Sequence, residues 1–178
     1  MTATAPDTVE TAITHRPGRW IDGWDPEDEG FWQRTGRGIA RRNLAWSIFA
    51  EFLGFIVWQL WSIVVVMLPA AGFSLSDTEL FWLISLPSLV GATLRFPYTF
   101  AVARFGGRNW TVASALLLLV PTLLFAFAVQ RPDTPYWAFC LIAATAGVGG
   151  GNFASSMANI NSFYPSHKLG AALGLNAA

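Results

Sequence analysis

The sequence predicts an all-α membrane protein with four transmembrane helices and the start of a fifth. Three observations point to this fold class: 53% of the 178 residues are hydrophobic, only 12% are charged, and the charges are unevenly placed. Residues 1–42 hold 13 of the 22 charged residues, and the remaining 136 residues share nine. A soluble fold of that length could not cover its surface with so few polar groups, so we expect it to face lipid.

The composition also argues against several classes of function. A formal net charge of zero gives no sign of nucleic-acid binding. One cysteine, Cys140, excludes an intramolecular disulfide framework, and two histidines, His15 and His167, leave no plausible zinc site. The sequence contains no phosphate-binding loop and no nucleophile paired with a base. We therefore expect no enzyme activity, no catalytic residue, no metal and no cofactor.

Residues 1–42 are predicted to form a cytoplasmic N-terminal tail with a short interfacial helix. We expect residues 1–19 to lack regular structure, and no apolar core of signal-peptide length is present. Asp25 followed by Pro26 favours a helix start, while two nearby glycines favour an early end. Aromatic residues beside arginines indicate a segment at the headgroup level. The alternative is a solvated tail with incidental aromatic side chains.

The rest of the chain, residues 43–178, is predicted to be a transmembrane bundle. Four apolar stretches each reach or exceed the roughly 20 residues that a helix needs to cross the hydrocarbon core. A fifth begins near the end of the chain and is too short to span, so we expect a truncated N-terminal part of a longer protein. The predicted spans are 43–69, 78–103, 110–129 and 135–163, with 168–178 incomplete.

The basic residues predict the orientation. With the N-terminus in the cytoplasm, the inside segments carry seven basic residues and the outside loops carry only Arg131. This excess follows the positive-inside rule, so we expect a multi-pass protein of the plasma membrane with a cytoplasmic N-terminus. The seven inside residues are Arg34, Arg37, Arg41, Arg42, Arg104, Arg108 and Lys168.

Two charged residues, Glu51 and Arg95, lie within the apolar spans. Both are eight or nine residues from the inner ends of their spans, roughly 12 Å deep by the helical rise. An arginine at that depth is costly, so we expect it to face the bundle interior and to have a partner. One interpretation is a buried Glu51–Arg95 ion pair. The other is an anion site, because a guanidinium group matches a planar oxyanion bidentately.

The fourth span combines small and polar residues. Asn152, Ser155 or Ser156, and Asn159 recur at helical spacing and predict a polar stripe on one face, which lines either a helix contact or a watery cavity. Phe153 falls on another face. Small residues let helices approach closely, and we expect this role for Gly147, Gly149, Gly150 and Gly151 here and for Gly170 and Gly174 in the fifth segment.

Several motifs then narrow the interpretation. The most specific is Asn-Phe-Ala-Ser-Ser-Met-Ala-Asn-Ile at 152–160, a polar run for a membrane span. The others are Trp-Asp-Pro-Glu-Asp at 24–28, Arg-Asn-Leu at 42–44, Gly-Ala-Thr-Leu-Arg-Phe-Pro-Tyr at 91–98, Phe-Gly-Gly-Arg-Asn-Trp-Thr at 105–111 and Gly-Ala-Ala-Leu-Gly-Leu-Asn at 170–176. With these motifs the chain resembles the nitrate/nitrite porter family of the major facilitator superfamily along nearly its whole length.

The resemblance implies roles for particular residues. Arg95 matches the second-helix arginine that grips the anion, and Phe153 and Phe55 match aromatic residues that flank it. Asn176, in the opening of the family's nitrate signature, is a further candidate for substrate contact. The glycines match those that let helices slide during alternating access. In such proteins a second arginine and a further aromatic residue come from a C-terminal half, which is therefore an expected partner.

Two departures from the family pattern affect the expected subtype. Ala177 and Ala178 stand where family members often have two glycines, which limits how closely the fifth helix can approach its neighbours. Glu51 stands where other members have an apolar residue. If it faces the cavity, it could be protonated and couple transport to protons; the alternative is that it pairs with Arg41 or Arg42.

We therefore expect transmembrane transport of nitrate and nitrite by alternating access, as an exchange of the two anions. The predicted partners are these anions, the lipid bilayer and the missing C-terminal half, with no nucleic acid. Proton-coupled nitrate transport through Glu51 and transport of another small anion by the same fold remain alternatives. A stand-alone membrane interaction subunit is a third alternative, from a different class of function.

Overall fold

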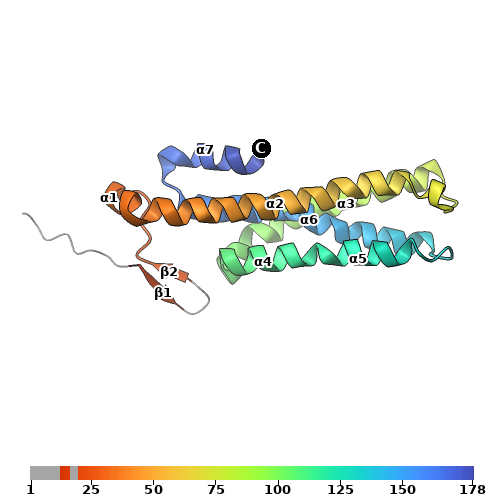
Figure 1. The fold of residues 1–178 in the computed structure, drawn as a ribbon, viewed down its shortest axis with the longest axis horizontal. Helices are drawn as coiled ribbons and strands as arrows, with labels where there is room; N and C mark the ends of the chain where they lie inside the picture. Colours follow the sequence, from red (N-terminus) through yellow and green to blue (C-terminus); the bar gives the residue numbers. More distant parts are fainter. Residues whose placement is uncertain (1–12, 17–19) are drawn as a thin grey trace, which may run out of the picture.

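The computed structural model describes residues 13–16 and 20–178. The helices of the described chain lie side by side in an elongated bundle (Figure 1). A small hairpin of two strands lies at the end of the bundle where α1 is found (Figure 1). We call this end of the bundle the hairpin end.

The hairpin pairs β1 (Thr14–Arg16) with β2 (Trp20–Asp22) in antiparallel register, and Arg16 forms a salt bridge with Asp22. The expectation that residues 1–19 lack regular structure is therefore wrong for this strand, because backbone pairing and an ion pair hold it. The remainder of residues 1–19, apart from residue 13, lies outside the described residues.

The first long helix begins earlier in the sequence than expected. It comprises α1 (Glu29–Phe31), the π-helical turn η1 (Trp32–Gly36) and α2 (Arg37–Val66), which together form one helical run of 38 residues. Asp28 caps its N-terminus by accepting a hydrogen bond from the backbone N–H of Phe31. The prediction of a separate short helix capped by Asp25 is wrong, because the Asp25 carboxylate accepts instead from the backbone N–H of Glu27.

The later helices follow through short turns. Pro121 ends α4, because proline has no N–H to donate to the carbonyl of Leu117 four residues earlier. Gly106, with φ of +80°, makes the sharp turn before α4. The elements are η2 (Pro69–Ala71), α3 (Asp77–Phe105), α4 (Gly107–Leu117), α5 (Leu119–Ala128), α6 (Tyr136–Phe163) and α7 (Ser166–Ala177).

Four helices are long and apolar enough to cross a membrane: Glu29–Val66, Asp77–Phe105, Gly107–Ala128 and Tyr136–Phe163. The third of these consists of α4 and α5 in succession. The shorter α7 follows as a fifth. The prediction of an all-α bundle with four long helices and the beginning of another is therefore confirmed.

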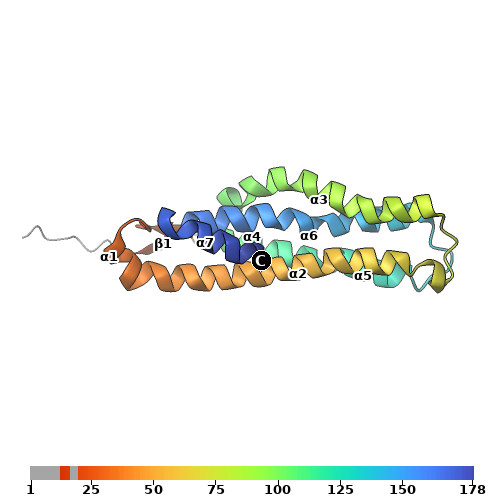
Figure 2. The ribbon, with the colours of Figure 1, turned by 90° about the horizontal axis from the view of Figure 1, so that it is seen from above.

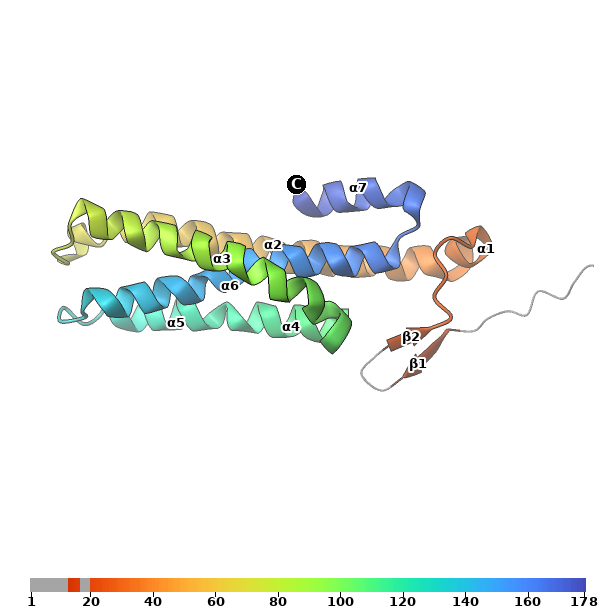
Figure 3. The same cartoon turned by 180° about the vertical axis from the view of Figure 1, so that it is seen from behind.

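The helix α6 is the centre of the bundle. Figure 2 shows α6 between α2 and α3, and Figure 3 shows α4 and α5 along its other side. The largest apolar core lies at the end opposite the hairpin, where Phe139 of α6 meets Leu83 of α3 and Trp61 of α2. The Trp61 indole N–H donates to the Leu83 carbonyl at 2.8 Å, so the one polar group of this ring is satisfied.

Glycines let α6 approach both neighbours closely. A Cβ on Gly149 would lie 2.8 Å from the Gly54 carbonyl oxygen of α2. A Cβ on Gly147 would lie 2.7 Å from the Pro87 carbonyl oxygen and 2.9 Å from the Gly91 backbone nitrogen, both in α3. Real Cβ atoms do not approach other atoms this closely, so the helices would have to move apart to accept any other residue.

Gly147→Ala is expected to destabilise the bundle by about 1–3 kcal/mol, because a methyl group there overpacks the contact between α6 and α3. Thermal unfolding of the purified chain in detergent measures the effect. Gly174→Ala is the matched control: a Cβ there meets nothing within 4 Å, and alanine is the better helix former. Equal destabilisation by the two changes would contradict the close packing at Gly147.

The segment before α2 folds back onto the junction between α6 and α7. The ring of Trp24 lies edge-on to Phe31 at 5.2 Å and to Phe163, the last residue of α6, at 5.0 Å. Trp32 is only 2% exposed and its ring lies 5.5 Å from that of Tyr164. We call Trp24, Glu27, Phe31 and Trp32 the N-terminal clasp.

Glu27 completes the clasp by capping α7. Its carboxylate accepts hydrogen bonds from the side-chain hydroxyl of Ser166 and from its backbone N–H, the latter at 2.7 Å. Pro165, which precedes α7, offers no side-chain cap of its own. A residue 139 positions earlier in the chain therefore satisfies the first N–H group of α7.

Glu27→Gln is expected to loosen the start of α7, because an amide is a weaker acceptor than a carboxylate and carries no charge for the helix dipole. The bonds from the Ser166 hydroxyl and N–H hold the pKa of the Glu27 carboxyl below its ordinary value of 4.5. The stabilisation is therefore full above pH 4.5 and is lost as the pH falls through that lower value.

Hydrogen-exchange mass spectrometry of the peptide that covers α7 measures this effect. At pH 7 the variant should exchange faster there than the parent chain, and the difference should disappear at a pH low enough to protonate Glu27. Glu29→Gln serves as the control, since the Glu29 carboxylate accepts a hydrogen bond from Gln33 of its own helical run. Unchanged protection of α7 in Glu27→Gln would show that the cap contributes nothing.

Candidate functional site

Three helices bring together the arginine and two phenylalanines that the sequence singles out. Arg95 comes from α3, Phe153 from α6 and Phe55 from α2. The guanidinium carbon of Arg95 lies 5.8 Å from the centroid of the Phe153 ring. The Phe153 and Phe55 rings meet edge to face, with centroids 6.4 Å apart. The guanidinium and the two rings therefore lie in the order Arg95, Phe153, Phe55, and we call these three residues the Arg95 row.

The cation of this row is accessible. Arg95 is exposed, and both phenylalanines are half-buried. The described helices do not enclose this arginine, whose side chain lies over the Phe153 ring. Its place in the interior of a complete bundle stays a prediction. A cation above an aromatic face is attracted by the ring quadrupole, which orients the guanidinium without using its N–H donors. Those donors stay available to an anion.

The ion pair between Glu51 and Arg95 does not form. Within the described residues, the salt bridges with N···O distances up to 4.0 Å consist of Arg16–Asp22 alone. The alternative pairing of Glu51 with Arg41 or Arg42 is excluded by the same observation. The two candidate residues therefore belong to two different environments, one open and one buried.

Glu51 lies in a buried polar cluster between α2 and α6. It is 2% exposed, and one carboxylate oxygen accepts hydrogen bonds from the Ser156 hydroxyl at 3.0 Å and the Asn152 amide at 3.5 Å. Its other oxygen, Oε1, is buried without a hydrogen-bond partner in the described structure. Burying a carboxylate without a cation is expensive, so neutral donors from α6 offset only part of the cost.

Asn176 joins this cluster from α7. Its amide nitrogen donates to the Ser156 hydroxyl at 3.0 Å, so Ser156 bridges Asn176 and Glu51. The side chain of Asn176 is 5% exposed, and its carbonyl oxygen has no hydrogen-bond partner within the described chain. The candidate substrate residue Asn176 thus contacts the Glu51 cluster, whereas Arg95, Phe153 and Phe55 form the separate row.

The polar stripe of α6 lines a helix contact. Asn159 donates to the Asn43 side-chain oxygen at 3.0 Å and to the Ser47 hydroxyl at 3.4 Å, both in α2. Ser155 bonds to Asn152 of its own helix. Of the two interpretations of this stripe, the helix contact is the one that the structure supports.

Sequence reasoning missed the opposing stripe on α2. Asn43, Ser47 and Glu51 follow each other at intervals of four residues, which places them on one face of a helix. This spacing was a usable signal, because three polar residues on one face of an apolar span need partners on another helix.

The six glycines predicted to pack helices fall into two groups. Gly147, Gly149 and Gly151 lie where an added Cβ would be within 3 Å of an atom in a neighbouring helix, and Gly150 lies against the Gly91 backbone. Gly170 and Gly174 of α7 have no heavy atom within 4 Å of such a Cβ. The gating role of all six stays a prediction.

The described residues, 13–16 and 20–178, contain no group of three or more His, Cys, Asp or Glu side chains arranged to hold a metal ion. The polar groups present at the two sites are a guanidinium, amides and hydroxyls, which donate hydrogen bonds, and one carboxylate, which accepts them. This chemistry suits the recognition of a small ion by hydrogen bonds and charge.

Comparison with known proteins places these features in a family. The family model of the Major Facilitator Superfamily matches residues 49–178. The "Nitrate/nitrite transporter NarU" of Salmonella typhimurium is 50% identical over 156 residues, which cover 88% of this chain and 34% of that protein. The "Probable nitrate/nitrite antiporter NarK2" of Thermus thermophilus is 45% identical over 160 residues, which cover 90% of this chain and 35% of the relative.

A more distant relative is the "Nitrite extrusion protein" of Bacillus subtilis, 30% identical over 142 residues, which cover 79% of this chain and 34% of that protein. The chain spans about a third of the length of these curated relatives. The resemblance to nitrate/nitrite porters is confirmed. Because the family model covers most of the chain, this protein belongs to the major facilitator superfamily.

Proposed function

We propose that this chain supplies the first membrane helices of a transporter that exchanges nitrate for nitrite by alternating access. The observation that carries the proposal is the row of Arg95, Phe153 and Phe55, in which an accessible guanidinium is held over a ring and has no acidic partner among the described residues. The names of the relatives at 45–50% identity support the choice of anions.

The row suits a small planar anion. A guanidinium offers parallel N–H donors in a flat fork, which matches two oxygens of a planar oxyanion. The positive edges of the phenylalanine rings favour an anion in their plane. In surroundings of low dielectric constant, charge-assisted hydrogen bonds offset the desolvation of the ion. The site then holds a monovalent anion without any resident metal.

Alternating access requires helices that change their contacts. The glycine contacts of α6 with α2 and α3 present smooth backbone surfaces, and such surfaces permit small sliding movements. Substrate sites of major facilitator transporters lie between two halves near the middle of the bilayer, so we propose that a C-terminal half completes the row. We also propose that the N-terminus and the tail, residues 1–42, are cytoplasmic, in the plasma membrane, as the seven inside basic residues favour.

Arg95→Lys is expected to reduce nitrate uptake at least a hundredfold, because lysine keeps the charge but loses the bidentate fork. Protein from the complete open reading frame is reconstituted in proteoliposomes, and labelled nitrate is followed against internal nitrite. Arg104→Lys changes the other exposed arginine of α3. It is the matched control, and this variant should exchange nitrate for nitrite normally. Normal uptake by Arg95→Lys would assign Arg95 a structural role.

Proton-coupled anion transport is the second candidate function. The observation that favours it is Glu51, a buried carboxyl without a salt bridge in the described chain and with one unpartnered oxygen. A proton on that oxygen would remove the charge and supply a donor. Exchange remains the first proposal, because the carboxyl contacts Asn152 and Ser156 and not the row that holds Arg95.

Glu51→Gln separates the two candidates. If the protein exchanges anions, the variant keeps counterflow of labelled nitrate against nitrite, and a pH gradient alone drives no uptake into vesicles of either protein. Glutamine preserves the hydrogen bonds from α6, so insertion and folding should be unaffected. Uptake that is driven by a pH gradient in the parent protein and lost in the variant would replace exchange by proton coupling.

A further inference from the structure

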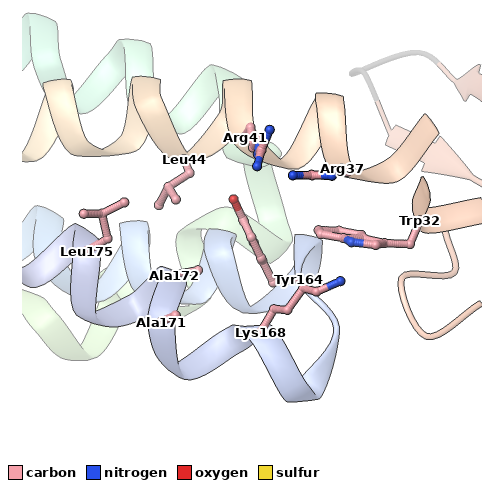
Figure 4. Close-up of a pocket in the computed structure, with 9 residues that line it drawn as sticks. All are labelled: Trp32, Arg37, Arg41, Leu44, Tyr164, Lys168, Ala171, Ala172 and Leu175. Atoms are coloured by element: carbon pink, nitrogen blue, oxygen red, sulfur yellow. The ribbon is translucent and has the colours of Figure 1, made fainter. Parts of the chain in front are cut away.

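A second group of cations, which shares no residue with the Arg95 row, lies in a groove between α2 and α7 at the hairpin end. The groove encloses a cavity of about 490 Å³. Figure 4 shows Arg37 and Arg41 projecting from α2 and Lys168 from α7, with the Tyr164 hydroxyl facing the arginines. The full lining is Trp32, Arg37, Arg41, Leu44, Tyr164, Lys168, Ala171, Ala172 and Leu175.

The two helices contribute matching patterns to the groove. On α2, Arg37, Arg41 and Leu44 recur at intervals of four and three residues, so they share one face. On α7, Lys168, Ala171 or Ala172, and Leu175 recur at the same intervals. Each face therefore begins with cations at the hairpin end and becomes apolar towards the middle of the bundle.

The cations of this groove are not neutralised by the described chain. Within residues 13–16 and 20–178, no acidic side chain lies within 4.0 Å of the charged nitrogens of Arg37, Arg41 or Lys168. Lys168 lies over the Trp32 ring at 5.2 Å, which fixes its direction without cancelling its charge. Three like charges that converge on one cavity repel each other, and an anion in the cavity would relieve that repulsion.

The position of the cavity along the two helices indicates which kind of anion would fit. The cavity lies where α2 and α7 begin their apolar stretches, which is where a membrane helix passes from water into lipid. Trp32 and Tyr164 are the residue types that occupy this interface. A ligand that fits has a negatively charged head for the cations and an apolar portion for Leu44 and Leu175.

We propose that this groove binds the phosphate of an anionic phospholipid, with Arg37, Arg41, Lys168 and the Tyr164 hydroxyl around the headgroup and an acyl chain along Leu44, Ala171 and Leu175. Basic pockets between membrane helices at the interface commonly bind such headgroups. The bound lipid links the start of α2 to the start of α7, beside the N-terminal clasp, which joins the segment before α2 to the junction between α6 and α7.

The test measures phospholipid binding to the purified chain in neutral detergent, by native mass spectrometry and by the midpoint of thermal unfolding. Phosphatidylglycerol should bind as a single retained adduct and raise the midpoint, and phosphatidylcholine should do neither. The double variant Arg41→Gln/Lys168→Gln should weaken phosphatidylglycerol binding roughly 25-fold, since each basic residue contributes about a fivefold effect. Equal binding by the variant, or equal binding of phosphatidylcholine, would overturn the proposal.

Three control experiments test whether binding depends on the groove, on its apolar wall and on the lipid itself. Arg42→Gln changes a neighbouring exposed arginine that does not line the groove, and it should bind as the parent chain does. Ala171→Phe fills the apolar wall without changing any charge, so it should weaken long-chain phosphatidylglycerol and spare the dihexanoyl form. Inorganic phosphate or nitrate that gives the same stabilisation at the same concentration would identify a free-anion site and overturn the lipid assignment.

Discussion

The bundle depends on the packing of α6, a helix that contacts α2, α3, α4, α5 and α7 and presents both polar groups and bare backbone to its neighbours. In lipid, an amide or hydroxyl without a partner is costly, so the polar stripe of α6 can exist only if α2 supplies matching groups. Those groups bond across the interface only because Gly54 and Gly149 let the two backbones come close. Polar pairing and close approach therefore require each other.

This constraint also positions the candidate anion site. Asn152 and Ser156 of α6 bond to Glu51 of α2, and Phe153, on a different face, lies against both Phe55 of α2 and Arg95 of α3. The same turn of helix thus holds Asn152 in a buried network and presents Phe153 to an accessible arginine. The open row and the buried Glu51 cluster are neighbours that share a scaffold, and the described hydrogen bonds of the carboxyl do not extend to Arg95.

Hydropathy and residue spacing predicted the helices and the polar stripe, because both follow from the period of a helix in lipid. The grouping of Arg95 with Phe55 and Phe153 was implied by the family resemblance alone. The cap at Asp28 was missed, since Asp25-Pro26 offered an equally good local signal and only the fold decides between them. Glu27 on Ser166 was beyond prediction, because nothing in the chain couples residues so distant before α6 and α7 are in place. The hydrogen-bond partners of Glu51 were also not predicted, because they depend on how α2 is rotated about its own axis relative to α6.

That rotation is set in part by the π-helical turn η1, which precedes α2. A π turn contains one more residue than an α turn, and each residue of an α-helix advances the side-chain direction by about 100°. The extra residue therefore changes the direction in which Trp32 points around the helix axis relative to Ser47 and Glu51. Trp32 faces Tyr164, whereas Ser47 and Glu51 face α6. With η1 as a regular α-helix, the chain could keep the contact of Trp32 with Tyr164 or the contacts of Ser47 and Glu51 with α6, but not both. The π turn therefore allows one continuous helix to form two interfaces.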